Sequence, residues 1–180
     1  LLTSTDRVGS LAGIPVVVQI VNAATASRTG RKLLDKALGV HPEAPLPKYH
    51  SSSARRRLRK SLTRQPAPQP TAETSGKVVL FTTCYGNRNE PDLATDLAAV
   101  FAHNGIAVTL AARERCCGMP KLETGDLEAV TRLKEQNIPQ LLRLVEQGYD
   151  IVAPIPSCVL MFKQELPLMF PDDAAVERVR

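Results

Sequence analysis

Three short apolar runs recur in the second half of the chain, and stretches with a different pattern separate them. The runs are Lys77–Thr83 (KVVLFTT), Ile106–Ala111 (IAVTLA) and Asp150–Ile155 (DIVAPI). Their lengths and their β-branched residues are typical of buried strands. Strands that alternate with helical stretches predict a parallel sheet with right-handed crossovers. We therefore expect an α/β domain with a Rossmann-like parallel sheet over residues 77–180.

The stretch between the first two runs predicts a helix with defined ends. It begins at Glu90-Pro91-Asp92, where proline and acidic side chains suit a first turn, and it ends at Asn104-Gly105. Large apolar side chains recur along it with helical spacing. We expect them to form one inner stripe, made of Leu93, Leu97, Val100 and Phe101.

A longer helix is predicted between the second and third runs, from Gly125-Asp126 to Gly148. Pro139 lies inside it and is expected to kink or split it, because proline removes a backbone hydrogen bond. The apolar positions expected from the periodicity are Leu127, Val130, Leu133, Ile138, Leu141, Leu142 and Val145.

The first third of the chain has a different character. Residues 1–64 predict a helical segment that contacts the α/β domain or a neighbouring module outside the chain. Residues 65–76 (QPAPQPTAETSG) predict a linker, because they are rich in proline and polar residues and offer nothing to bury. We expect the chain to be a fragment, since it begins with Leu1 and residues 174–180 resemble a helix that is cut partway.

Composition and charge narrow the function classes. The 180 residues are 43% hydrophobic and 23% charged, which is typical of a globular protein, and no apolar run is long enough to span a membrane. Four cysteines without an export signal indicate a reducing, cytoplasmic setting.

The net charge of +5 comes from one basic run, which we interpret as a solvated helix face or linker flank. No aromatic residues interrupt that run, so nucleic acid is not an expected partner. The run consists of Arg55, Arg56, Arg57, Arg59, Lys60 and Arg64.

Each predicted strand is followed by cysteine. Cys84 comes directly after the first strand, Cys116 and Cys117 follow the second, and Cys158 follows the third. Because the carboxyl ends of parallel strands meet at one edge of a sheet, the four thiols should lie together there. Small buried hydrophobes are the alternative interpretation, since unpaired cysteine is often buried. Core packing does not explain why all four follow strands, so we expect a thiolate-bound metal or iron–sulfur site.

Residues beside the cysteines suit such a site. Gly86 allows a tight turn after the first cysteine, and Gly118 lets the backbone come close to a bound group. Lys121 is expected to stabilise thiolate charge or to hold an anionic substrate, with a solvated loop cation as the alternative. The predicted site thus consists of four thiolate ligands and a surrounding shell.

The cysteine spacing resembles that of the CCG cysteine-rich domain. The resemblance rests on Cys84, a gap of 31 residues, the Cys116-Cys117-Gly118 motif, and a gap of 40 residues between Cys117 and Cys158. The family includes one of the heterodisulfide reductase subunits and the iron–sulfur subunits of anaerobic glycerol-3-phosphate dehydrogenase and glycolate oxidase. The resemblance covers about residues 77–171. It implies iron–sulfur electron transfer within a multi-centre oxidoreductase, with a redox partner or flavoprotein subunit and further iron–sulfur modules.

One departure from the family pattern concerns the last motif. The family motif ends in Cys-x-x-Cys, whereas Met161 stands three residues after Cys158 in this chain. Four thiolates suffice for a [4Fe–4S] cluster or for Zn²⁺, so both are compatible with the sequence. Met161 is expected to pack against the site, because a thioether is a weak ligand beside thiolates. A third alternative is a thiol-redox domain in which Cys116-Cys117 or Cys84 and Cys158 form disulfides.

Overall fold

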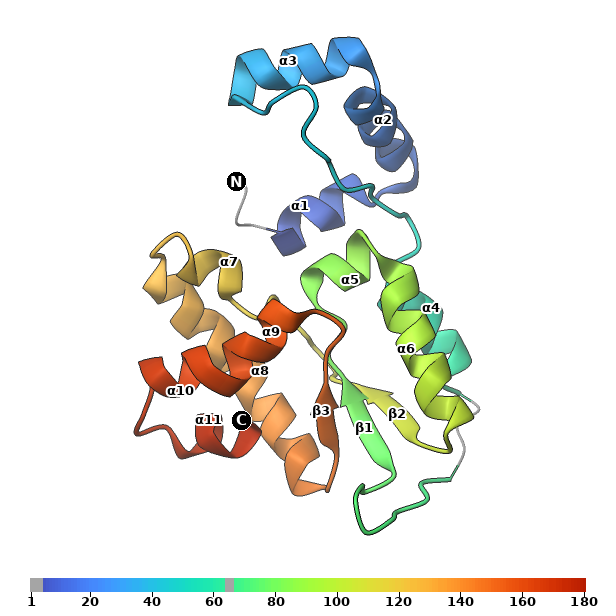
Figure 1. The fold of residues 1–180 in the computed structure, drawn as a ribbon, viewed down its shortest axis with the longest axis vertical. Coiled ribbons are helices and arrows are strands. Elements are labelled where there is room, and N and C mark those ends of the chain that lie inside the picture. The colour runs from blue at the N-terminus through green and yellow to red at the C-terminus, as the bar shows by residue number, and fades with distance from the viewer. Residues whose placement is uncertain (1–4, 64–66) are drawn as a thin grey trace.

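The protein is an α/β structure built on a three-stranded parallel sheet (Figure 1). This computed structural model describes residues 5–63 and 67–180; Arg64 of the basic run and residues 65–66 of the predicted linker lie outside the described residues. The strands are β1 (Lys77–Leu80), β2 (Ala107–Leu110) and β3 (Asp150–Val152), in the order β2-β1-β3. Val79 pairs with Thr109 on one side and with Ile151 on the other. The predicted α/β fold is confirmed.

Alternation along β1 divides the core into two apolar clusters, because successive side chains of a strand point to opposite faces. Val79 and Phe81 belong to the larger cluster, whereas Val78 and Leu80 belong to the smaller one. All four side chains are buried. We call the corresponding sides of the sheet the large face and the small face.

The large face is covered by α8 and by the helices that follow β3. Val130, Ile138 and Leu141 of α8 are buried there, and Pro139 lies within this single helix without splitting it. The Phe81 and Phe162 rings meet edge to face, with their centroids 5.0 Å apart. The helices of this face are α8 (Leu127–Glu146), α9 (Pro156–Leu160), the π-helix η1 (Met161–Glu165), α10 (Leu166–Met169) and α11 (Ala174–Val179).

The small face is covered by α6 (Pro91–His103) and α4 (Ala54–Ser61). The predicted inner stripe of α6 is partly wrong: Leu93 and Val100 are 44% and 57% exposed. Ala94 and Ala98 are buried in their place, because small side chains let α6 approach the sheet and α4 closely. A related correction applies to α8, where Leu127 is 52% exposed.

The basic run forms α4, and this helix is part of the core although it precedes the predicted linker. Ala54 and Leu58 are fully buried against the small face. The interpretation of the run as a solvated face is therefore wrong for one side of the helix. Arg56 and Arg59 on the other side are exposed, as expected.

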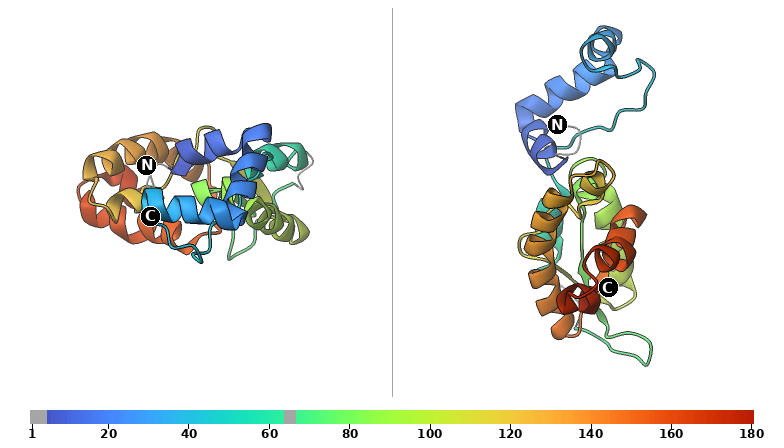
Figure 2. Two further views of the ribbon diagram at one scale, coloured as in Figure 1. Left: turned by 90° about the horizontal axis from the view of Figure 1, so that it is seen from above. Right: turned by 90° about the vertical axis from the view of Figure 1, so that its left-hand side faces the viewer.

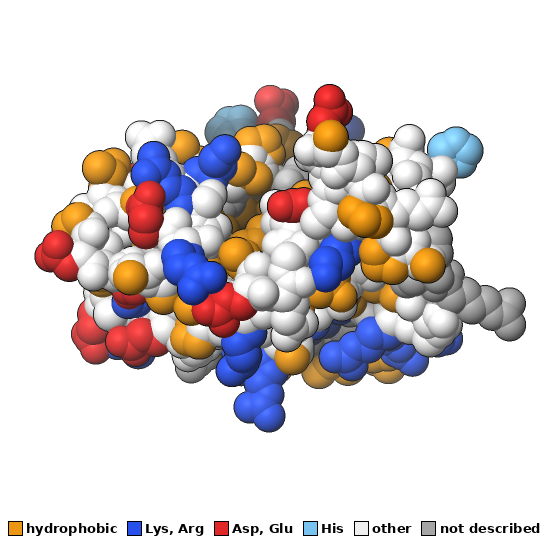
Figure 3. Space-filling model, turned by 90° about the horizontal axis from the view of Figure 1, so that it is seen from below, with side chains coloured by type: hydrophobic (Ala, Val, Ile, Leu, Met, Phe, Trp, Pro, Cys, Tyr) orange, Lys and Arg blue, Asp and Glu red, His pale blue; other side chains and the backbone are white. Residues whose placement is uncertain are grey.

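The remaining helices of the first segment are α1 (Thr5–Ala12), α2 (Pro15–Ala26) and α3 (Arg28–Leu38). α1 contacts α5 (Cys84–Arg88), whereas α2 and α3 lie at the end of the molecule remote from the sheet (Figures 1 and 2). Within the described residues, no helix combines the length and apolar character that crossing a membrane requires. Viewed from below, the opposite end of the molecule carries basic and acidic side chains side by side (Figure 3).

Candidate metal centre

The four cysteines occupy the loops and helix starts at the carboxyl ends of the strands. Cys84 is the first residue of α5, Cys116 and Cys117 precede α7 (Met119–Leu122), and Cys158 lies in α9. The chain passes from β1 to β2 on one side and returns to β3 on the other. Ligands of open α/β sheets bind at such a reversal of strand order.

The structure brings the four thiols into contact. The Cys84 and Cys116 sulfurs are 3.7 Å apart. The Cys117 thiol forms hydrogen bonds with the thiols of Cys116 and Cys158. All four side chains are thiols and not disulfides. A continuous series of sulfurs therefore runs from the loop after β1, past the loop after β2, to the helix after β3.

The thiols differ in their surroundings. Cys116, Cys117 and Cys158 are buried, whereas Cys84 is half-buried. The hydrogen bonds with Cys116 and Cys158, together with burial, raise the pKa of the Cys117 thiol. Removing its proton in this environment is costly unless a positive charge arrives at the same place.

The residue before Cys84, Thr83, has a strained backbone conformation. Its φ of 64° and ψ of 159° belong to a region that is normally restricted to glycine. The Thr83 hydroxyl accepts a hydrogen bond from the Gly86 N–H at 3.0 Å, which caps α5. A Cβ at Gly86 would lie 3.2 Å from that hydroxyl, so glycine allows the turn to close.

Gly118 shapes the loop that carries Cys116 and Cys117. Its φ of 106° lies in the left-handed region, and an added Cβ would be 3.3 Å from Met161 Cε. Met161 is fully buried in the same cluster as Cys117 and Cys158. Met161 therefore packs beside these two cysteines.

Two buried amides of α8 fix the backbone before and at Cys116. Asn137 Oδ1 accepts from the Arg115 N–H at 3.0 Å, and its Nδ2 donates to the Cys116 carbonyl at 3.0 Å. One turn further on, Gln140 forms a matching pair of hydrogen bonds with the backbone of Arg113, both at 2.9 Å. These amides connect the cysteine loop to the large face.

A buried carboxylate joins the loops after β1 and β2. Glu114 accepts hydrogen bonds from the Thr82 N–H at 2.9 Å and from the Thr82 hydroxyl, and it pairs with Arg55 at 2.8 Å. Burial raises the pKa of Glu114, while the Arg55 charge and the Thr82 hydrogen bonds act in the opposite direction. The carboxylate thus sits two residues from Cys116 and binds a residue two positions from Cys84.

Lys121 forms an ion pair with an acidic residue after the cysteine loop. Its ammonium lies 3.1 Å from Asp126, the residue whose side chain caps α8. Hydrogen bonds from Lys121 and from the Ala129 N–H lower the pKa of Asp126. The pair connects the short helix after the cysteine loop to the start of α8.

The sequence interpretation missed Glu114, Arg55, Asn137 and Gln140. For the two amides a signal existed, because Asn137 and Gln140 stand at helical spacing next to the core residues Ile138 and Leu141. Polar residues at such positions are buried only when they have partners. Arg55 and Glu114 are separated by 59 residues and carry no local signal that pairs them.

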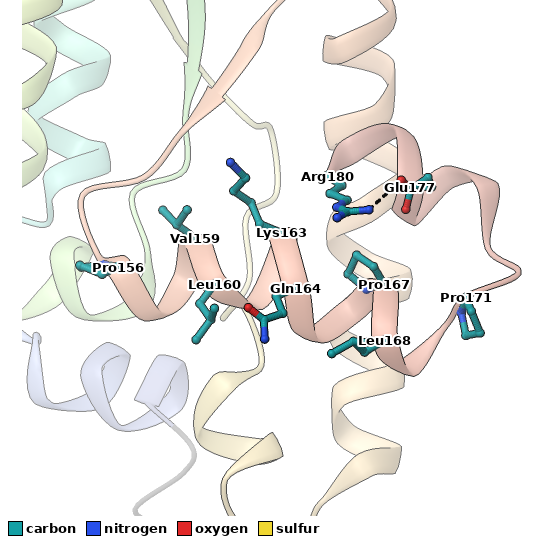
Figure 4. Close-up of a pocket in the computed structure, with 10 residues that line it drawn as sticks. All are labelled: Pro156, Val159, Leu160, Lys163, Gln164, Pro167, Leu168, Pro171, Glu177 and Arg180. Atoms are coloured by element: carbon teal, nitrogen blue, oxygen red, sulfur yellow. Dashed lines mark hydrogen bonds and ion pairs between the residues drawn. The ribbon is translucent and has the colours of Figure 1, made fainter.

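A separate groove of about 840 Å³ lies on the outer side of α9, η1 and α10 (Figure 4). Val159 and Leu160 form part of its wall, whereas Cys158 is buried in the apolar cluster of the large face. The labelled side chains in Figure 4 include no cysteine, so the groove is distinct from the thiol site.

Among the described residues, no group of three or more His, Cys, Asp and Glu side chains has the spacing of a ready metal site. The sulfurs pack against one another instead. Their chemistry nevertheless fits a soft metal centre, since thiolates bind zinc and iron–sulfur clusters in preference to hard cations. The chain is thus an α/β protein with a thiol-rich site at the carboxyl edge of its sheet.

Comparisons with known proteins agree with this class. The family described as the CCG cysteine-rich domain matches residues 78–163. One of the subunits of the anaerobic glycerol-3-phosphate dehydrogenase of Escherichia coli (strain K12) is 30% identical over 167 residues, which is 92% of this chain and 40% of the relative. Lactate utilization protein A of Bacillus thuringiensis (strain Al Hakam) is 30% identical over 97 residues, which is 54% of this chain and 38% of that protein.

Residues 78–163 match the CCG cysteine-rich domain family, as the resemblance in the sequence predicted. It spans about two fifths of the length of the curated relatives that it matches. No solved structure matches the chain.

Proposed function

We propose that the thiolates of Cys84, Cys116, Cys117 and Cys158 hold an iron–sulfur cluster, and that the chain is an electron-transfer part of a multi-centre oxidoreductase. The contact between four thiols from three separate segments carries this proposal. Such clusters are held by cysteine thiolates, and four of them suffice for [4Fe–4S]. The names of the relatives, one from a dehydrogenase and one a lactate utilization protein, support an oxidoreductase setting.

The chain's own residues would enclose the cluster unevenly. When bound, a cluster supplies a centre that exchanges single electrons. Burial of Cys116, Cys117 and Cys158 would exclude water from one side, whereas the half-buried Cys84 would leave the other side open. Exposure and hydrogen bonds at sulfur tune the potential of such centres. We therefore propose that a redox protein or flavoprotein subunit exchanges electrons beside α5.

Further iron–sulfur modules in a longer chain and a cytoplasmic location belong to the same proposal. Thiols must lose their protons to bind metal, so loading the site would release protons. The sulfurs are packed closely, so their loops would have to separate to admit a cluster.

Zinc is a second candidate for the bound metal, and the separation of the Cys84 and Cys116 sulfurs favours it. A tetrahedral zinc ion with Zn–S bonds of about 2.3 Å places its sulfurs about 3.8 Å apart. The Cys84 and Cys116 sulfurs, at 3.7 Å, already have that separation. A structural zinc site in an interaction domain would need less movement than a cluster.

Metal analysis of protein purified without oxygen tests both candidates. We expect iron and inorganic sulfide in similar amounts, together with an EPR signal in one redox state. Replacing any one of the four cysteines with Ser should lower the iron content, whereas Met161→Leu, the matched control, should leave it unchanged. Zinc without iron would replace the cluster proposal with the zinc proposal. Absence of both metals after reconstitution with iron, sulfide or zinc would contradict both.

The cluster type can be tested at Met161. Met161→Cys places a fifth thiol in the buried shell, next to Gly118. If the cluster proposal is right, this variant should differ from the parent in EPR spectrum or potential, because potentials respond to the sulfur ligands. A spectrum identical to that of Met161→Leu would show that the added thiol is not a ligand.

A further inference from the structure

Arg55 contacts both of the segments that carry Cys84 and Cys116. Its backbone N–H donates to Asn87 Oδ1 at 3.0 Å, and Asn87 belongs to α5, the helix that begins with Cys84. Its guanidinium pairs with Glu114 at 2.8 Å and also donates to the Ala111 carbonyl at the end of β2. One residue from the helix before the linker therefore bridges two cysteine-bearing segments.

Glu114 completes the bridge on the side of the sheet. Its carboxylate accepts the Thr82 N–H and the Thr82 hydroxyl, at 2.9 Å each. The side chains of Glu114 and Arg55 are only 4% and 14% exposed. A carboxylate this well buried requires a partner, so this pair differs from surface ion pairs, which contribute little.

We propose that Arg55 and Glu114 are positioning residues that set the separation of the Cys84 and Cys116 loops and thereby the geometry of the thiol site. What the thiols hold rests on the proposed function; the control of their separation does not. Glu114 holds Thr82, the Arg55 guanidinium holds Glu114, and the Arg55 backbone N–H ties the same helix to Asn87 of α5. Without Arg55, the buried carboxylate loses its charged partner, which loosens the hold of Glu114 on the loop of Cys116.

The competing interpretation is that α4 only contributes general stability. The helix also packs through Ala54 and Leu58, and Arg57 pairs with Asp92 of α6 at 2.6 Å. Arg57→Gln is therefore a control that loosens the same helix without touching the bridge. Arg56→Gln is a second control, because that side chain is exposed.

The test measures how readily Cys84 and Cys116 pair in the reduced, metal-free chain. The chain is equilibrated with glutathione disulfide: two protein thiols form one disulfide, and one glutathione disulfide becomes two glutathione thiols. Peptide mapping after acid quenching gives the fraction of the Cys84–Cys116 disulfide and hence its effective concentration. We expect Arg55→Gln to lower this effective concentration by about tenfold, as for the loss of one buried charged hydrogen bond, and both controls to stay within about twofold.

Two further variants keep the test decisive. Arg55→Lys retains the charge but not the forked geometry, so it should give an intermediate decrease even if Arg55→Gln does not fold. The double variant Arg55→Met/Glu114→Gln retains an acceptor for the Thr82 N–H without a buried charge, so it should restore most of the parent value. Equal effects of Arg55→Gln and Arg57→Gln, or an unchanged value in Arg55→Lys, would overturn the proposal.

Metal content and EPR spectra of the same variants separate this inference from the proposed function. If the parent binds neither iron nor zinc, the proposed function fails, but the thiol equilibrium still decides the role of Arg55. If the parent binds a cluster, Arg55→Gln should alter its EPR spectrum, whereas Arg57→Gln should not.

Discussion

The two halves of the thiol site are held by different forces. Cys117 and Cys158 are members of the apolar cluster on the large face, together with Met161 and Phe162. Cys84 begins α5 and Cys116 lies in a loop, and the positions of both segments depend on hydrogen bonds and one ion pair. Apolar packing tolerates shifts as long as volume is conserved, whereas hydrogen bonds fix direction and distance. The site thus has a packed half and a tethered half.

This difference assigns separate tasks to the two halves. The packed half supplies stability and excludes water from the sulfurs. The tethered half sets where the more exposed sulfur, Cys84, lies relative to Cys116. All buried polar side-chain atoms among the described residues have hydrogen-bond partners, so the tethers are complete. We therefore expect substitutions in the packed half to change stability most, and substitutions in the tethers to change thiol geometry more than stability.

The largest loss of stability is expected from Phe162→Ala. Phe162 is 5% exposed and meets Phe81 edge to face, so its removal leaves a cavity beside the site. We expect a loss of about 3–5 kcal/mol in the free energy of unfolding. Denaturant unfolding measures it, with Leu160→Ala as control, because Leu160 is 42% exposed on the same run of helices. Similar losses for both variants would contradict the idea that apolar packing stabilises this half of the site.

A smaller loss is expected from Asn137→Ala, which acts on a tether. It leaves the Arg115 N–H and the Cys116 carbonyl without their Asn137 partner, at a cost of about 2 kcal/mol. The alkylation rate of Cys116 in the metal-free chain should rise relative to that of Cys158. Gln136→Ala, at an exposed position of the same helix, should change neither quantity. An unaltered ratio of Cys116 to Cys158 alkylation in Asn137→Ala would show that Asn137 does not hold the Cys116 loop in place.

At Thr83, two substitutions separate the cap from the backbone strain. Thr83→Ala removes the hydroxyl that caps Gly86 and retains the strain, so it should cost about 1 kcal/mol. Thr83→Gly also removes the cap but relieves the strain, which is of order 1–3 kcal/mol for such a conformation. Thermal unfolding should therefore rank Thr83→Gly above Thr83→Ala. The reverse order would mean that the strain relieved is smaller than the conformational entropy that glycine adds to the unfolded chain.

The smallest effect is expected far from the tethers, at the junction of α8 and α11. Lys134 pairs with Asp173 at 2.6 Å and lies over the Phe170 ring. The hydrogen bond from Lys134 lowers the pKa of Asp173, so the pair stabilises the fold above the ordinary aspartate pKa of about 3.9. Lys134→Gln should cost less than about 1 kcal/mol at pH 7.

The pH dependence gives this last prediction its sign. As the pH falls below about 3.9 and through the lowered pKa of Asp173, the carboxylate is protonated and the pair is lost. The stability difference between parent and Lys134→Gln should then shrink toward the contribution of the Phe170 ring contact. Arg132→Gln, in the exposed pair with Glu128, is the control. A stability difference between parent and Lys134→Gln that grows toward acid pH would contradict a stabilising pair of Lys134 and Asp173.

Much of the fold could be predicted from the sequence because its signals are local. The three strands follow from short β-branched runs, and the ends of α6 follow from Pro91 and Gly105. The inner side of α6 could not be predicted in the same way. Large apolar residues recur on more than one side of that helix, and the choice of Ala94 and Ala98 depends on how closely α4 approaches.

For the site, the positions of the cysteines were predictable and their tethers were not. A residue that follows a strand reaches the carboxyl edge whatever else the fold does, so the four cysteines could be placed together from strand order alone. The partner of Arg55 depends on which strand neighbours which helix, and that is a property of the whole fold. The charge of the basic run also suggested solvent, although Leu58 and Ala54 within it supply an apolar side.

The place of α4 in the chain has a consequence for the order of folding. During synthesis α4 is made before any strand of the sheet, yet Leu58 and Arg55 have no surface to bind until β1, α6 and Glu114 follow. Contacts that span so much chain close late, because the entropy of the intervening loop must be lost first. The helix must therefore wait beside the growing chain until Glu114 has been made. Cys158 is made later still, so the return of α4 can bring Cys84 and Cys116 together before the chain reaches its last thiol.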